Sequence, residues 1–186
     1  MRIISGQFKG KKILDPKDKN TRPLKDLTKE SIFNIIHHSN KIFFKLQNSN
    51  VLDLFSGVGS FGLEALSRNA GSVTFVENYF NVIKVLKKNI ENLELKQKCK
   101  VIEKDVFYDL NFAKLNQEYD LIFLDPPFKE NKIRELMENL NKSNILDKEG
   151  MIILHRNKKY KDQLPQKFKI ELEKTYGSSK IIFGSF

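Results

Sequence analysis

Cysteine is almost absent from this sequence: one residue, Cys99, stands among 186. A lone cysteine cannot form an internal disulfide, so we expect an inert thiol and a reducing compartment, the cytoplasm. Long apolar runs are absent as well, since no stretch approaches the roughly 20 apolar residues that a membrane span needs. Charges return within a few positions of Met1, which is not typical of a secretory signal. The sequence predicts a cytoplasmic protein that does not enter a membrane.

Histidine is scarce and poorly placed for metal binding. His37 and His38 are neighbours in a stretch with helical spacing, and His155 lies far away along the chain. Structural and catalytic metal sites need several ligands at short, regular spacings, and the sequence shows no such spacing. We expect no metal site, and we interpret all three histidines as surface or packing residues.

Acidic residues are the minority, with 23 Asp and Glu against 33 Lys and Arg and a net charge of +10. The surplus is uneven, because residues 1–45 hold eleven basic and four acidic residues. Neutralising phosphates releases counterions, so a basic segment of this kind predicts a nucleic-acid partner. Lys9, Lys11 and Lys12 are the candidates for contact with RNA. The alternative is a lysine-rich proteome in which lysine is the default surface residue.

Hydrophobic residues make up 40% of the chain, and 15 phenylalanines can fill a solid core. Residues 2–4 and 11–14 flank a glycine-containing turn and predict a hairpin. The apolar spacing of residues 24–39 predicts a helix capped by Asp26 or Thr28, and a short helix or turn follows at 41–47. We assign residues 1–48 to a basic, RNA-contacting extension and residues 49–186 to the main domain.

From residue 49 onward the pattern alternates between strands and helices. Strands are predicted at 51–55, 72–76, 100–103, 119–124 and 151–155, and helices at 63–67, 79–93, 108–115, 131–140 and 157–164. Such repeats form a doubly wound, mostly parallel sheet with right-handed crossovers, which gives an α/β fold. The last two runs, 168–172 and 180–183, are joined by a tight turn and must pair antiparallel.

The first motif follows the strand at 51–55 and satisfies the pattern G-x-G-x-x-G with Gly57, Gly59 and Gly62. Between a strand and a helix, such a loop brings backbone amides and the positive end of the helix to one ligand. Glu77 ends the next strand and can accept both hydroxyls of a ribose, in NAD and in S-adenosylmethionine alike. Asp53 favours S-adenosylmethionine, because it can hold the loop and meet a cofactor ammonium that NAD lacks.

The second motif, Asp125-Pro126-Pro127-Phe128, follows the strand at 119–124, where ligands of parallel sheets bind. Asp125 and the Pro126 carbonyl can each accept one N–H of an exocyclic amine and favour its attack on a methyl sulfonium. The prolines fix φ and offer no competing amide donor. Phe128 offers a face on which an extruded base stacks. The alternative is a plain Pro-Pro turn with an aspartate cap.

Four stretches carry a family resemblance. They are Arg2–Gly6 with Gly10 and Leu14, Thr21-Arg22-Pro23 with Glu30 and Ile32-Phe33-Asn34, Asp53–Gly59 with Gly62–Arg68, and Asp125–Phe128. Over nearly its whole length the chain resembles the bacterial 16S ribosomal RNA (guanine-N2)-methyltransferases, which are class I S-adenosylmethionine-dependent enzymes. The resemblance implies a seven-stranded sheet with its last strand antiparallel. It also implies methylation of one guanine in 16S rRNA, on an assembling 30S particle, and we expect a monomer.

The resemblance implies roles for single residues as well. The cofactor residues are Asp53, Phe55, Gly57, Gly59, Glu77, Asp105 and Val106; the catalytic residues are Asp125, Pro126, Pro127 and Phe128. Within the first set, Asp105 reaches the adenine amine and Val106 lies beside the ring, although Asp105 could instead cap a loop. Thr21 and Arg22 line the substrate side, although Arg22 could instead pair with Glu30.

The chain departs from the family pattern at two places and leaves other functions open. Tyr79 and the pair His155-Arg156 stand where the family pattern leads us to expect acidic residues. An adenine-N6 methyltransferase of RNA or DNA would use the same second motif, because adenine N6 is also an exocyclic amine. A non-catalytic ribosome-assembly factor would keep only the fold and the RNA surface. A nicotinamide dehydrogenase ranks last, since no hydride-site constellation is evident.

Overall fold

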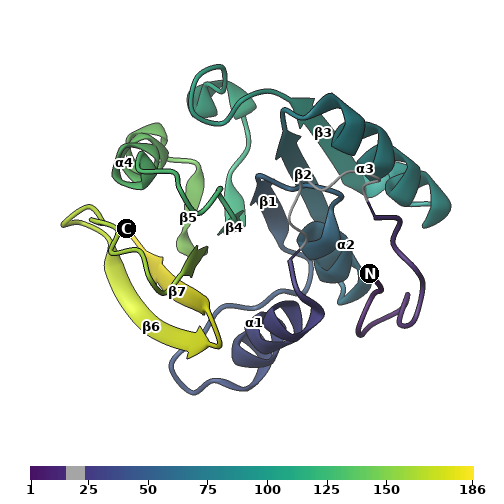
Figure 1. The fold of residues 1–186 in the computed structure, drawn as a ribbon, viewed down its shortest axis with the longest axis horizontal. Coiled ribbons are helices and arrows are strands. Elements are labelled where there is room, and N and C mark those ends of the chain that lie inside the picture. Colours follow the sequence, from purple (N-terminus) through teal and green to yellow (C-terminus); the bar gives the residue numbers. More distant parts are fainter. Residues whose placement is uncertain (16–23) are drawn as a thin grey trace.

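The computed structural model describes residues 1–15 and 24–186 and contains a seven-stranded sheet in the order β3-β2-β1-β4-β5-β7-β6 (Figure 1). The strands are β1 (Asn50–Leu54), β2 (Ser72–Glu77), β3 (Cys99–Glu103), β4 (Tyr119–Leu124), β5 (Leu146–Asn157), β6 (Lys169–Tyr176) and β7 (Ser179–Ser185). The first five pair in parallel, and β7 lies antiparallel between β5 and β6. The predicted fold class is confirmed.

Helices cover both faces of the sheet. They are α1 (Asp26–His38), α2 (Ser60–Ser67), α3 (Phe80–Asn92) and α4 (Ile133–Ser143), with short 3-10 turns η1 (Lys96–Lys98) and η2 (Phe112–Leu115). Alternate residues of each strand point to opposite faces. In β4, Phe123 therefore packs with α1, α2 and α3, whereas Ile122 packs with α4 and η2. In the described parts of the chain, no helix has the length and apolar character to cross a bilayer.

The order of the strands places a reversal between β1 and β4. From β1 the chain moves outward through β2 to β3, and it then returns to β4 and moves the other way. The carboxyl ends of β1 and β4 are thus neighbours, and the helices that follow them leave on different faces. A crevice opens at such a switch point in open α/β sheets, and ligands bind there.

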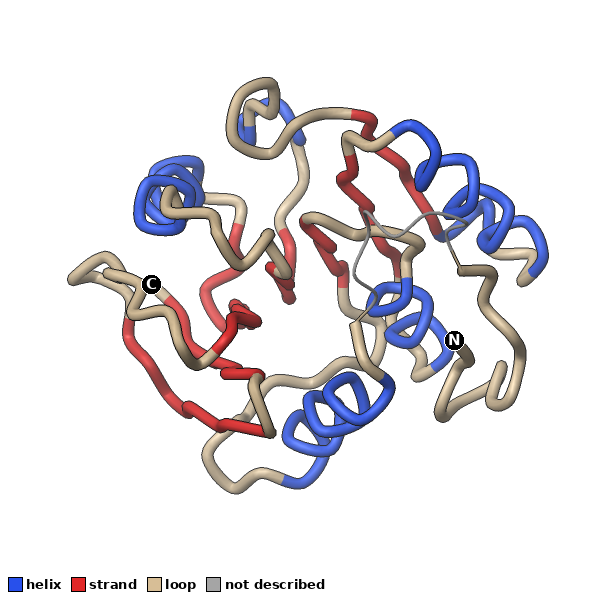
Figure 2. Tube along the Cα trace, viewed as in Figure 1, coloured by secondary structure: helices blue, strands red, loops and turns tan. Residues whose placement is uncertain are grey.

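The N-terminal segment forms a hairpin that docks on α2, but it does not form the two regular strands predicted from the sequence (Figure 2). Only Arg2 and Lys12 make an antiparallel bridge. The amides of Ile4 and Ser5 donate instead to the carboxylate of Glu64, at 2.8 and 3.0 Å. Because these N–H groups are used by a side chain of the helix, they are not available to a partner strand.

Three other local predictions were wrong or incomplete. Residues 157–164 contain no helix, because β5 continues to Asn157 and the chain then turns back to place Asp162 against Arg156. Within 108–115, only the 3-10 turn η2 forms. Helix α1 begins at Asp26 after Lys25, with no side-chain cap.

A close approach at Gly6 gives the first prediction. Gly6 has φ +83°, and a Cβ there would lie 1.8 Å from the backbone oxygen of Ser67 at the end of α2. Gly10 has nearly the same φ, +85°, with nothing within 4 Å of its Cβ position. We expect Gly10→Ala to cost about 1–2 kcal/mol of unfolding free energy, for the left-handed backbone alone. Gly6→Ala should cost about 3–5 kcal/mol, because the hairpin must also move away from α2.

Urea unfolding of the two variants beside the wild type measures this difference. Equal losses at Gly6 and Gly10 would show that the hairpin does not need its close contact with α2.

Candidate functional site

The ends of β1 and β4 lie side by side. Leu54 pairs with Leu124 in the parallel ladder, and the Asp125 amide donates to the Leu54 carbonyl at 3.4 Å. Phe55 and Asp125, the first residues beyond these strands, therefore enter the same space. The two sequence motifs meet where the strand order reverses.

A cavity of about 670 Å³ lies over these strand ends. The residues proposed for the cofactor that line it are Asp53, Phe55, Gly57, Glu77 and Asp105, and those of the second motif are Asp125, Pro126, Pro127 and Phe128. Gly59 and Val106 are close by but do not line the wall. One cavity thus contains most of the residues proposed for the cofactor and all four proposed catalytic residues.

The glycine loop turns sharply beneath this cavity. Gly59 has φ +84° at the N-cap of α2, and a Cβ there would lie 2.5 Å from a methyl carbon of Leu86 on α3. The loop therefore needs glycine at this position for its backbone angle, and α3 packs directly against it.

Glu77, at the end of β2, fastens the loop from the neighbouring strand. Its carboxylate accepts the Gly57 amide at 2.8 Å and the Asn78 and Tyr79 amides at 2.9 and 3.0 Å. Tyr79, where an acidic residue was expected, thus contributes its backbone to the same carboxylate. The position of Glu77 agrees with a group that receives ribose hydroxyls beside a preformed loop.

Asp53 is buried under the loop, with 1% of its surface exposed, and accepts the Gly62 amide at 3.0 Å. Burial raises the pKa of this carboxyl well above its ordinary value. The Gly62 hydrogen bond opposes the rise, and the nearby charges of Asp125 and Glu77 add to it. Burial disfavours the ionised form of this carboxyl, so a cation that enters the cavity would stabilise that form.

The side chains that line the cavity fit S-adenosylmethionine better than a dinucleotide. Five acidic residues line the cavity, and the described lining contains no lysine or arginine. A pyrophosphate would be repelled there, whereas a sulfonium and an ammonium would be attracted. The hydroxyls of Ser56 and Ser60 also lie in this wall, buried and without a hydrogen-bond partner in the described structure. Buried hydroxyls of this kind fit a site that a polar ligand completes.

The raised pKa of Asp53 predicts a proton-linked cofactor affinity. A cation bound beside Asp53 lowers its pKa, so binding of S-adenosylhomocysteine, which also carries the ammonium, should release protons at pH values above the ordinary carboxyl range. Calorimetry in buffers of different ionisation enthalpy measures this release. In Asp53→Asn the release should disappear, and affinity should no longer rise with pH. The same shift makes the ligand-free fold less stable as pH rises above the ordinary carboxyl range.

A release of protons that persists in Asp53→Asn would assign the linkage to another group. Asp120→Asn is the control, because Asp120 caps the Asn50 amide at the opposite end of β1.

The second motif has a partner that the sequence analysis missed. His155 of β5 is buried, and its Nδ1 lies 2.8 Å from Oδ1 of Asp125. This histidine is therefore not a surface residue, and besides packing in the interior it makes a polar contact that the sequence did not predict. Its only signal in the sequence was its place beside Arg156, at a departure from the family pattern.

Comparison with known proteins decides the family. A family model described as "Conserved hypothetical protein 95" matches residues 1–185. The chain belongs to this family. The ribosomal RNA small subunit methyltransferase D of Haemophilus influenzae is 33% identical over 178 residues, which is 95% of this chain and 89% of that protein. Its counterpart in Escherichia coli K12 is 31% identical over 152 residues, 82% of this chain and 72% of the relative.

Solved structures agree with this family membership. The structure of yhhF from Escherichia coli matches with a TM-score of 0.80 at 27% identity, covering 99% of this chain and 96% of that one. The structure of HI0767 from Haemophilus influenzae matches with a TM-score of 0.75 at 33% identity, covering 98% and 96%. The resemblance drawn from the sequence motifs is confirmed.

Of the two neighbouring residues predicted to meet the adenine, Asp105 lines the cavity and Val106 does not. Asp105 lines the cavity and accepts the amides of Phe107 and Tyr108, at 2.8 and 3.2 Å, so it caps this turn. Val106 is buried in the core. Its neighbour Phe107 lines the cavity instead, with its ring 5.2 Å from that of Phe55. Phe107 was not predicted, and it gives the cavity an aromatic wall.

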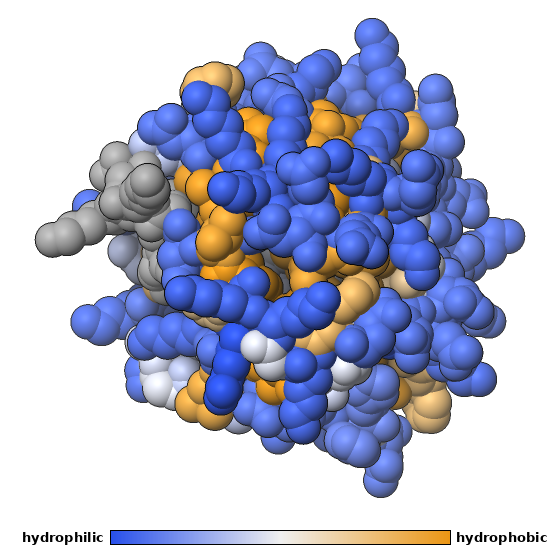
Figure 3. Space-filling view, turned by 90° about the vertical axis from the view of Figure 1, so that its right-hand side faces the viewer, coloured by the Kyte–Doolittle hydropathy of each residue, from blue (hydrophilic) through white to orange (hydrophobic). Residues whose placement is uncertain are grey.

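The lysines predicted to contact RNA stand apart from the cavity. Lys9, Lys11 and Lys12 are exposed on the hairpin that docks at the end of α2, whereas the cavity lies at its beginning. Hydrophilic side chains cover most of the surface on this side of the molecule (Figure 3). Thr21 and Arg22 lie outside the described residues.

The predictions on metal binding and on the single thiol concern residues outside the cavity as well. In residues 1–15 and 24–186, no group of three or more His, Cys, Asp or Glu side chains is placed to hold a metal ion. Burial raises the pKa of Cys99 to about 12, so its thiol is a weak nucleophile at neutral pH.

Proposed function

We propose that this protein transfers a methyl group from S-adenosylmethionine to the exocyclic N2 of a guanine in 16S rRNA. Its place of action would be the cytoplasm, and its substrate the assembling 30S particle, on which it would act as a monomer. The observation that carries this proposal is the shared cavity, in which Glu77 at the end of β2 and Asp53 of β1 stand on one side and Asp125, just beyond β4, on the other. The relatives are named as small-subunit ribosomal RNA methyltransferases, and these names supply the class of acceptor.

The donor side of the cavity would hold the cofactor by groups of complementary charge. Glu77 would accept the ribose hydroxyls, Asp53 the ammonium, and Asp105 the adenine amine, with Phe55 and Phe107 against the ring. S-adenosylmethionine supplies an electrophilic methyl group on a sulfonium. Because acidic side chains line this cavity, the protein can bind a cationic cofactor inside and still present a basic surface to RNA.

The acceptor side would orient the amine. Asp125 accepts one N–H and the Pro126 carbonyl the other, while Phe128 stacks on the extruded base. Nitrogen gains the methyl group and loses one proton, which Asp125 accepts or passes to water. Holding the two reactants in line supplies much of the rate, since effective molarities can reach about 10⁵ M or more.

An assay with labelled S-adenosylmethionine tests the function. Undermodified 30S particles and naked 16S rRNA are offered as separate substrates, and the labelled nucleoside is identified after digestion. We expect N2-methylguanosine, with more label on particles than on naked RNA. Label on N6 of adenosine would support the adenine enzyme, whose motif requirements are the same. Cofactor binding without transfer to any RNA would support the assembly factor.

The basic hairpin predicts a salt-dependent contribution to RNA binding. Reversal of Lys9, Lys11 and Lys12 to glutamate should weaken 30S binding and flatten its salt dependence by about 2–3 units of slope, one for each lost phosphate contact. Reversal of Lys167, Lys169 and Lys174, which are exposed on and before β6, is the matched control with the same charge change. Equal slopes for the two triple variants would place the RNA surface elsewhere.

A further inference from the structure

The carboxyl end of β5 directs two consecutive buried side chains at the acceptor motif. His155 and Arg156 are 2% and 1% exposed. Successive side chains of a strand point to opposite faces, so the two residues reach the motif from opposite sides of the sheet. Neither side chain is part of the apolar core, and each makes polar contacts with the motif or with the residues just beyond it.

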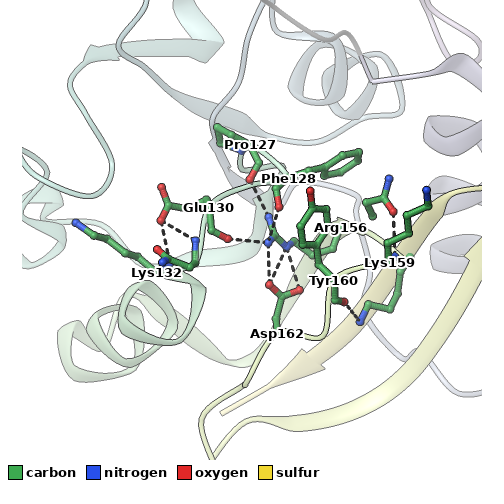
Figure 4. Close-up of polar contacts among 11 residues, drawn as sticks. Pro127, Phe128, Glu130, Lys132, Arg156, Lys159, Tyr160 and Asp162 are labelled. Atoms are coloured by element: carbon green, nitrogen blue, oxygen red, sulfur yellow. Dashed lines mark hydrogen bonds and ion pairs between the residues drawn. The ribbon is translucent and has the colours of Figure 1, made fainter.

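Arg156 binds the backbone that follows Pro126 (Figure 4). One terminal nitrogen, Nη1, donates to the Pro127 carbonyl at 2.9 Å. The other, Nη2, donates to the carbonyls of Phe128 and Glu130, at 3.2 and 2.8 Å. The Pro126 carbonyl, which the proposed reaction needs as an acceptor, is not among these contacts.

Asp162 neutralises the buried guanidinium. Its carboxylate accepts Nε–H at 3.0 and 3.1 Å and Nη2–H at 2.8 Å. The side chains of Arg156 and Asp162 are only 1% and 7% exposed, so water does not weaken this pair strongly. With one edge of the guanidinium held by Asp162, the other is fixed in the direction of the three carbonyls.

The arginine therefore supports a stretch that has no regular structure of its own. Residues 125–132 form neither helix nor strand, and α4 starts only at Ile133. Carbonyls in a helix or strand would be fixed by their ladder, whereas here a side chain from β5 binds them. The position of Phe128, the proposed stacking platform, depends on this support.

His155 acts on the other end of the motif. An ionised carboxylate can only accept, so the contact with Asp125 places the hydrogen of the imidazole on Nδ1. Nε2 then accepts from the hydroxyl of Ser179 at 2.9 Å, on the antiparallel strand β7. The ring also meets Phe128 edge-on, with centroids 5.7 Å apart. One imidazole thus fixes the Asp125 carboxylate and borders the platform.

We propose that His155 and Arg156 are positioning residues for methyl transfer: Arg156, paired with Asp162, sets the backbone of residues 127–130, and His155 sets the carboxylate of Asp125. This role rests on the proposed function, because it concerns the geometry of the same acceptor motif. It requires a loss of turnover when the contacts are removed, with cofactor binding retained on the other side of the cavity.

The guanidinium is tested with Arg156→Lys and Asp162→Asn. A lysine ammonium cannot reach Asp162 and three carbonyls at once, and an asparagine amide carries no charge and replaces one of the two acceptor oxygens by an NH₂ donor. We expect kcat to fall about 100-fold in each, since displacements near 1 Å can have effects of this size. The Kd for S-adenosylhomocysteine should stay within about 3-fold of wild type. Arg134→Lys, at an exposed arginine that pairs with Glu138 on α4, is the control and should leave kcat unchanged.

The imidazole is tested with two variants of similar size. His155→Asn keeps an N–H donor near the position of Nδ1, and His155→Leu removes it. We expect kcat to fall about 30-fold in the leucine variant and by less than about 5-fold in the asparagine variant, since the donor is what orients Asp125. Equal losses in the two variants would mean that His155 only fills space, and would overturn its part of the proposal.

Hydrogen exchange separates this proposal from the proposed function. The Glu130 amide donates to the Pro127 carbonyl at 3.0 Å, and its exchange should accelerate at least about 10-fold in Arg156→Lys but not in Arg134→Lys. If wild type does not methylate RNA, the function fails, and this exchange still reports whether Arg156 holds the loop. If wild type methylates RNA and Arg156→Lys keeps its kcat or loses cofactor affinity to the same extent, the positioning role is wrong.

Discussion

Asp125→Asn should lower kcat for methyl transfer about 10³-fold while the Kd for S-adenosylhomocysteine stays within about 3-fold of wild type. Asparagine fills the same volume between the strand end and His155 but carries no charge and offers one acceptor oxygen instead of two. The lone pair of an exocyclic amine is delocalised into the base, and a charged acceptor for its N–H is what makes it available. General-base effects of about 10²–10⁴-fold bracket this expectation.

Single-turnover kinetics on undermodified 30S particles measures the loss, and calorimetry measures the retained affinity. Asp109→Asn is the control, because Asp109 is exposed in the turn that Asp105 caps and does not line the cavity. A kcat unchanged in Asp125→Asn would remove this carboxylate from the reaction.

Glu77→Ala should raise the Kd for S-adenosylhomocysteine about 100-fold or more. The variant loses the proposed acceptor for the ribose hydroxyls and also the carboxylate that fastens the amides of Gly57 and Tyr79. Hydrogen bonds to a charged group are each worth about 1.5–3 kcal/mol, so the loss of two is sufficient. At saturating cofactor, kcat should fall far less than in Asp125→Asn.

Glu103→Ala is the matched control for this second variant. Glu103 lies on the adjacent strand β3 and pairs in register with Glu77 of β2. Its carboxylate, however, is 44% exposed and bonds to Lys87. A Kd that rises equally in both variants would indicate a general effect on the edge of the sheet. A Kd unchanged in Glu77→Ala would place the ribose elsewhere.

The parts of the site that could be predicted were residues that closely follow a strand along the chain. Gly57 follows its strand by three residues, and Asp125 follows its own directly, so the strand pattern alone places each at a carboxyl end. Parallel pairing in a doubly wound sheet brings these ends to one edge, and the structure shows that Leu54 and Leu124 are direct neighbours there.

The parts that could not be predicted depend on contacts between distant residues. His155 meets Asp125 across 30 positions, and whether its ring faces the cavity or the other side depends on the register of β5. Arg156 draws residues 157–162 back toward the sheet, which overrides their helical pattern. Regular N-terminal strands do not form, because a buried glutamate of α2 takes the amides of Ile4 and Ser5.

A crystal structure of the complex with S-adenosylhomocysteine is the most direct test of the shared cavity. The ribose should contact Glu77, the ammonium Asp53, and the sulfur should face Asp125 across open space for a base. A ligand seated away from the β1 end, or with its sulfur turned from Asp125, would contradict the assignment of donor and acceptor to adjoining strands.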